Sequence, residues 1–83
     1  MSLHYGAASR YYEGMNLYDL YTQDGFKGLR RLADVVGMNP KYLYQCATGR
    51  RTPSAEVAVK LVKADRRLTR EALRPDIFGD DAA

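Results

Sequence analysis

The chain has 83 residues, of which 46% are hydrophobic and 28% charged, and its formal net charge is +3. This length limits it to one small domain with little room for a deep substrate cavity, and the composition excludes an intrinsically disordered chain. The single cysteine, Cys46, excludes a disulfide framework and an all-cysteine metal site. The sequence contains no run of about 18 apolar residues and no cleavable signal pattern, so we expect a cytoplasmic protein with no membrane partner.

Residues 1–14 have no helical periodicity, and we expect them to form a loosely ordered extension ahead of a domain over residues 15–78. Asn16 is a suitable N-cap for a first helix, in which Leu17, Leu20 and Tyr21 recur at helical spacing. Gly25 ends that helix. Residues 79–83 carry acids and no bases, and we expect them to form a flexible acidic tail.

The second and third expected helices are separated by only three residues. From Lys27 to Val36 the apolar residues share one helical face, namely Leu29, Leu32, Ala33 and Val36. Gly37 can take the left-handed conformation that ends a helix. Asn39 then caps a helix over residues 40–48, with Pro40 at the first position, where no amide donor is needed. The inward stripe of that helix is Leu43, Cys46 and Ala47.

The remaining chain predicts two more helices. Thr52 and Pro53 repeat the pattern of a cap followed by proline, for a helix that reaches about Ala64. This helix is apolar on most sides, so we expect it to be the most buried one. Thr69 caps a short last helix that Pro75 stops, and we expect Ile77 and Phe78 to pack back on the domain. The fold class is therefore all-α, with five helices.

Two helices joined by a short glycine turn are typical of a helix-turn-helix. The first helix needs a small residue where the second crosses it, and Ala33 lies at that position. Gly37 supplies the turn, while Leu43 and Cys46 anchor the second helix in the core. This spacing is similar to the pattern of phage repressor and Cro-type proteins. An ordinary helical hairpin in a small bundle stays open as the alternative.

Longer segments carry a closer resemblance. They are Met15-Asn16-Leu17, Leu32-Ala33 to Gly37, Gly49-Arg50-Arg51, Pro53 to Glu56, and Thr69 to Phe78. On these residues the chain from Met15 to Phe78 resembles the Cro-like, YdaS-type family of proposed antitoxins and prophage regulators. The resemblance implies a compact lambda-repressor/Cro-like domain, DNA binding and a role as a transcriptional repressor. Two tyrosines within residues 41–45 depart from the family's smaller or polar residues, so the resemblance does not carry over an operator sequence.

Positive charge is concentrated between residues 27 and 52, where six lysines and arginines stand against one acid, Asp34. This concentration is the expected footprint of a polyanionic partner, although a solvated charged surface gives the same count. The candidates for phosphate contacts lie near the 40–48 helix or on the helix before it. They are Asn39, Thr48, Arg50, Arg51, Thr52 and Arg31.

The outward face of the 40–48 helix is expected to hold Lys41, Tyr42, Tyr44, Gln45 and Thr48. In a helix-turn-helix this face meets the base edges in the major groove of double-stranded DNA. Gln45 can pair with adenine N6 and N7, and Lys41 can donate to guanine O6 or N7. We expect base contacts from Lys41, Tyr42, Tyr44 and Gln45, with a phosphate contact or plain exposure as the alternative for each.

Other function classes have weaker support. We expect no enzyme, cofactor or metal site, because the only histidine, His4, lies in the extension and Cys46 has a core-facing spacing. The alternative function is an antitoxin or interaction module whose main partner is a protein toxin. Its docking patch would be Tyr5, Tyr11, Tyr12, Tyr18 and Tyr21.

If the protein is a DNA regulator, we expect it to bind as a homodimer to two half-sites about 34 Å apart. The two copies would pair through the extension or the Ile77–Phe78 end.

Overall fold

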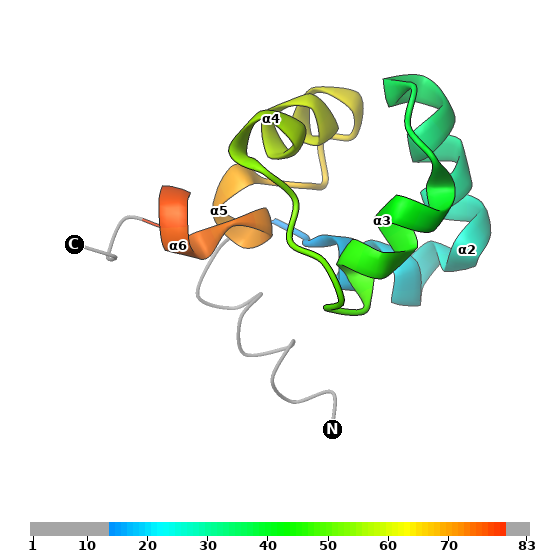
Figure 1. Ribbon diagram of the computed structural model, residues 1–83, viewed down its shortest axis with the longest axis horizontal. Helices are drawn as coiled ribbons and strands as arrows, with labels where there is room; N and C mark the ends of the chain where they lie inside the picture. Colours follow the sequence, from blue (N-terminus) through cyan, green and yellow to red (C-terminus); the bar gives the residue numbers. More distant parts are fainter. Residues whose placement is uncertain (1–13, 80–83) are drawn as a thin grey trace.

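The computed structural model describes residues 14–79, so residues 1–13 of the expected extension and residues 80–83 of the expected tail lie outside the described residues. Within that range the chain forms five helices and no strand (Figure 1), which confirms the predicted all-α class. The helices are α2 (Leu17–Val36), α3 (Pro40–Ala47), α4 (Ala55–Ala64), α5 (Arg70–Leu73) and α6 (Pro75–Phe78). No helix in the described part is long and apolar enough to cross a membrane.

Helix α2 joins the two helices that the sequence predicts before Gly37. Asn16 caps its start: the Asn16 side chain accepts from the Asp19 N–H at 2.8 Å, and the Asp19 carboxylate accepts from the Asn16 N–H at 3.1 Å. Gly25 has φ 76° and ψ −172°, so the helical backbone breaks at the predicted place. The helix resumes at the next residue, and both runs, 17–24 and 26–36, supply leucines to the core.

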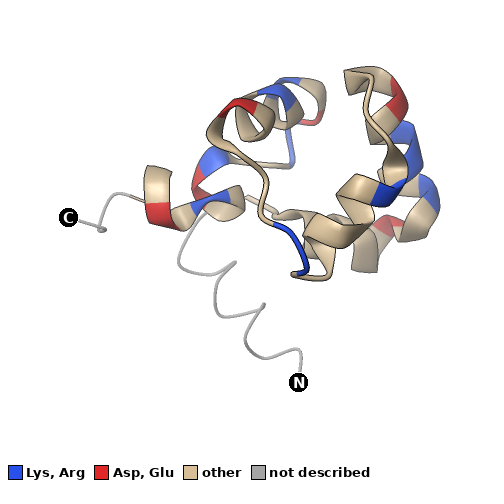
Figure 2. Cartoon of the chain, in the orientation of Figure 1, with Lys and Arg blue, Asp and Glu red and all other residues tan. Residues whose placement is uncertain are grey.

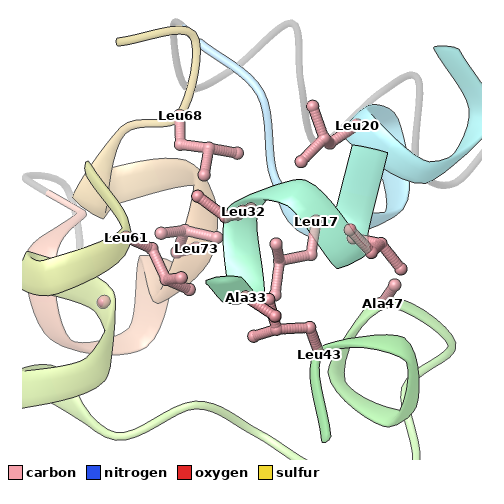
Figure 3. Packing of buried hydrophobic residues seen from close by; sticks show 11 residues of the cluster. Leu17, Leu20, Leu32, Ala33, Leu43, Ala47, Leu61, Leu68 and Leu73 are labelled. Atoms are coloured by element: carbon pink, nitrogen blue, oxygen red, sulfur yellow. The ribbon is translucent and has the colours of Figure 1, made fainter. Parts of the chain in front are cut away.

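The core is one cluster of leucines and alanines contributed by α2, α3, α4 and the α5 region (Figure 3). Helix α2 supplies five of its side chains, Leu17, Leu20, Leu29, Leu32 and Ala33. Helix α4 buries only Ala58 and Leu61, and its valines are half-buried, because the other helices cover it on one side. The expectation that α4 is the most buried helix was therefore wrong, and α2 takes that role.

Helix α4 also begins later than predicted. Ser54 is the N-cap in place of Thr52, and its hydroxyl oxygen accepts from the Val57 N–H at 3.2 Å. Pro53 is buried ahead of the helix, and its carbonyl accepts from Arg74 Nη1 at 2.7 Å. Residue 53 therefore lies outside the first turn and contacts a residue far along the chain.

The end of the domain differs from the prediction at Pro75. The proline ends α5 as expected, but it also takes the first position of α6, where its missing N–H costs nothing. Phe78 packs against the core as predicted, and the Arg70 guanidinium lies 5.5 Å from its ring centroid. Ile77 is 49% exposed, contrary to the prediction, because a single helical turn cannot direct both neighbouring side chains inward.

Contacts distant in sequence tie α2 to the segment between α4 and α5. The Met15 N–H donates to the Arg67 carbonyl at 2.7 Å, and Met15 forms an isolated parallel bridge with Leu68. The Arg67 guanidinium forms ion pairs with Asp24 of α2 at 2.9 Å and with Asp65 at 2.8 Å. These contacts hold the start of α2 against the end of α4.

Candidate nucleic-acid interface

The turn between α2 and α3 has the predicted local structure. Gly37 takes a left-handed conformation, φ 74° and ψ 36°, and both its N–H and that of Met38 donate to the Ala33 carbonyl. The Asn39 side chain accepts from the Lys41 N–H at 2.8 Å, and Pro40 opens the helix. Ala33 is fully buried, as the close approach of the two helices requires. These contacts fix α3 against the second run of α2.

Helix α3 has one face in the core and one face in solvent. Leu43 and Ala47 are buried, and Cys46 packs partly buried against the same cluster, as predicted. The predicted outward residues divide into two groups. Lys41, Tyr44 and Thr48 are exposed, and Gln45 is half-buried. Tyr42 was expected to point outward, but it is half-buried and packs against the core cluster.

Tyr42 lies one helical turn before Cys46. Burial raises the pKa of the Tyr42 hydroxyl, and the neighbouring Cys46 thiol raises it further. Burial also raises the pKa of the Cys46 thiol, although the Tyr42 hydroxyl and the positive charge of Arg51 act in the opposite direction. Both groups are therefore neutral near pH 7, and Cys46 behaves as a small core residue instead of a reactive thiol.

Tyr44 belongs to an aromatic cluster that the sequence did not predict. Its ring meets the Tyr21 ring edge-on at 5.4 Å between centroids and the Phe26 ring edge-on at 6.1 Å. Phe26 directly follows the break at Gly25 and is 43% exposed, while Tyr44 is 37% exposed. The only sequence feature that could have indicated a role for Phe26 in this cluster is its position directly after the glycine that breaks the helix. Of the tyrosines proposed as a docking patch, Tyr18 and Tyr21 are half-buried, and Tyr5, Tyr11 and Tyr12 lie outside the described residues.

The loop after α3 folds back on the helix end. Gly49, at φ 87°, turns the chain, and the backbone N–H groups of Arg50 and Arg51 donate to the Gln45 carbonyl at 2.9 and 3.2 Å. Arg51 Nε donates to Gln45 Oε1 at 2.8 Å. The Thr48 hydroxyl donates to the Tyr44 carbonyl at 3.0 Å, so its proton is used within the helix. The loop therefore holds Arg51 beside Gln45.

The basic residues near α3 have no ion-pair partner among residues 14–79, a property they share with Lys60, Lys63 and Arg66 but not with Arg67 and Arg74. In Figure 2 basic residues mark the start of α3 and the loop after it. Arg67 and Arg74 are both ion-paired, the second with Asp76 at 2.6 Å. Within residues 14–79 neither Lys41 nor Arg50 has an ion-pair partner. Positive charge that internal acids do not neutralise therefore lies next to α3.

Of the remaining candidate phosphate-contact residues, two lie near α3 and one does not. Asn39 and Thr52 are exposed at the two ends of the α3 region. Arg31 is exposed on α2, where it lines a surface hollow with Lys27, Arg30 and Asp34, none of which comes from α3 or the 49–52 loop. The structure therefore groups Asn39, Lys41, Gln45, Arg50, Arg51 and Thr52 around α3 and places Arg31 in a separate basic cluster.

Among the described residues, no group of three or more His, Cys, Asp or Glu side chains is placed to hold a metal ion. His4 lies outside the described residues. Comparison of the chain with models of protein families, with curated proteins and with solved structures gave no match.

Proposed function

We propose that the protein is a DNA-binding transcriptional regulator, acting as a repressor, that places residues 40–48 in the major groove of double-stranded DNA. The observation that carries the proposal is the geometry of α3. One face of the helix is locked against α2 through Leu43 and Ala47, and the other presents Lys41 and Gln45 beside a basic loop. In this proposal the second run of α2, the Gly37 turn and α3 form a Cro-like helix-turn-helix.

The groups around α3 suit the two kinds of contact that a DNA duplex offers. Arg50 and Thr52, on the exposed loop, and Asn39, at the helix start, are placed to meet phosphate oxygens. Lys41 and Gln45 are placed to meet base edges. Tyr44 extends the surface toward α2, where an aromatic ring can touch a thymine methyl group, and the half-buried Tyr42 flanks Gln45 on the opposite side of the helix face. A homodimer would place two such helices about 34 Å apart on a palindromic site.

The decisive experiment is selection of bound DNA from a random duplex pool by the full chain at physiological salt. We expect a short palindromic consensus whose affinity falls steeply as salt rises, because phosphate contacts release counterions. Gln45→Ala should flatten the base preference at one position of each half-site, whereas a solvated control, Val35→Ala on the exposed side of α2, should leave the consensus unchanged. Failure to retain any duplex at low salt would contradict the proposal.

The second candidate is an interaction module whose partner is a protein, such as a toxin. It is favoured by the exposed aromatic pair Phe26 and Tyr44, because exposed aromatic side chains are enriched where proteins meet. This candidate predicts no appreciable affinity for duplex DNA at low salt and a partner that protects Phe26 and Tyr44. The random-duplex selection separates the two candidates in one measurement.

A further inference from the structure

We propose that Gln45 and Arg51 act as one recognition unit that selects guanine over adenine at one base pair; this rests on the proposed DNA binding. The sequence suggested separate roles, with Gln45 reading adenine and Arg51 holding phosphate. The structure joins the two side chains through the hydrogen bond from Arg51 Nε to Gln45 Oε1 at 2.8 Å.

The position of Arg51 next to Gln45 is set by backbone hydrogen bonds as well as by the contact between the two side chains. Gly49 reverses the chain, and two consecutive backbone N–H groups, of Arg50 and Arg51, donate to the Gln45 carbonyl at 2.9 and 3.2 Å. These backbone hydrogen bonds hold residue 51 over the end of α3 independently of its side-chain contact. The hydrogen bond from Arg51 Nε then holds the guanidinium beside the Gln45 amide.

The bond changes what Gln45 can recognise. A glutamine reads adenine with both ends of its amide, donating to N7 from Nε2 and accepting from the N6 amino group at Oε1. Here one of the two lone pairs of Oε1 already accepts from the Arg51 guanidinium, and the positive charge beside the other lone pair opposes the approach of a further N–H donor. The unit therefore faces a base mainly with donors, the two N–H groups of Gln45 Nε2 and the terminal N–H groups of the Arg51 guanidinium. Guanine offers two acceptors in the major groove, O6 and N7, whereas the N6 amino group of adenine would oppose these donors.

Arg50 provides a matched control in the same loop. It is exposed, and in the part of the chain that the structure describes its side chain forms no hydrogen bond or ion pair. It carries the same charge as Arg51 and differs in the contact with Gln45. A role that depends only on charge near phosphate would make the two arginines equivalent, whereas the recognition unit makes them different.

The test measures equilibrium binding of the full chain to four duplexes that differ only at the position where Gln45→Ala alters base preference. We expect the unmodified protein to favour guanine over adenine there by about 5- to 150-fold, the range of one bidentate base contact. Arg51→Ala should abolish that preference and shift it toward adenine, because the guanidinium no longer opposes the approach of N6 to Oε1 of Gln45. Arg50→Ala should weaken binding to all four duplexes by the same factor.

Two results would overturn the recognition unit while leaving DNA binding intact. One is an equal loss on all four duplexes for Arg51→Ala, which would make Arg51 a phosphate contact like Arg50. The other is a preference of the unmodified protein for adenine at the position that depends on Gln45. If the unmodified protein binds none of the duplexes even at low salt, the proposed function fails, and the recognition unit fails with it.

Discussion

At the scale of single residues, Ala33 determines how closely α2 and α3 approach. Its side chain is fully buried at their crossing, next to Leu43 of α3. Ala33→Leu would insert methylenes where no space exists, and we expect it to lower the free energy of unfolding by about 1–3 kcal/mol. Urea unfolding of the full chain measures this loss.

Val35→Leu is the control for Ala33, because it enlarges a side chain on the same helix that is 68% exposed. We expect it to change the free energy of unfolding by less than about 0.5 kcal/mol. Equal stability of the two variants would show that Ala33 is not a packing constraint between α2 and α3.

Arg50 tests the phosphate side of the proposed interface. Because Arg50 is exposed and its side chain has no ion-pair partner among residues 14–79, Arg50→Ala should leave the unfolding midpoint unchanged. Removal of one phosphate contact should reduce the slope of log affinity against log salt by about 0.9. Titrations against specific and random duplexes at several salt concentrations give the slope, and an unchanged slope would remove Arg50 from the interface.

At the scale of elements, the start of α4 distinguishes the structure from the sequence prediction. Ser54 accepts the Val57 N–H at 3.2 Å and is the N-cap, whereas Thr52 lies two residues upstream and is exposed. We expect Ser54→Ala to lower the free energy of unfolding by about 1 kcal/mol through loss of the cap. Thr52→Ala is the matched control and should have little effect on thermal unfolding; the reverse order would restore Thr52 as the cap.

The helices that the sequence predicts well are those whose ends are set by neighbouring residues. The Asn39 cap, Pro40 at the first position and the Gly37 turn all act within a few residues, so the pattern fixed α3 to within one residue of its end. Pro53, which the prediction placed in α4, is instead buried ahead of it, with its carbonyl accepting from Arg74, a residue distant in sequence. No local pattern contains that contact.

As with the helix boundaries, the part of the candidate site that depends on local spacing was predictable from the sequence, and the part that depends on distant contacts was not. Helical spacing alone places Lys41, Tyr44 and Gln45 outside and Leu43 inside. It did not place Tyr42, because a long side chain beside the core stripe can fold inward. Phe26 and the bond between Arg51 and Gln45 were also missed, because both depend on how a glycine turn redirects the chain after a helix segment ends.

Across the whole domain, Arg67 connects the α4–α5 segment to α2 through its ion pair with Asp24, and Asp65 holds the same guanidinium from within that segment. The hydrogen bonds from Arg67 hold the pKa of the Asp65 carboxyl below its ordinary value of 3.8, although burial acts in the opposite direction. A carboxyl whose pKa is lower in the folded chain than in the unfolded chain contributes stability above the unfolded value, and that contribution is lost as pH falls through the folded value. We therefore expect a contribution that is complete near pH 6, begins to fall near pH 4 and is lost only when pH drops below the folded pKa of Asp65.

The measurement is the thermal midpoint of the full chain and of Asp65→Asn between pH 7 and pH 2.5. Asp65→Asn removes the titrating group, so we expect its midpoint to lie below that of the unmodified chain at pH 7 and the two midpoints to converge as pH falls below 4. Asp34→Asn is the control, because Asp34 is exposed and has no ion-pair partner among the described residues, so its midpoint should follow that of the unmodified chain. A constant difference between Asp65→Asn and the unmodified chain at every pH would mean that the carboxylate charge does not stabilise the link between α2 and the α4–α5 segment.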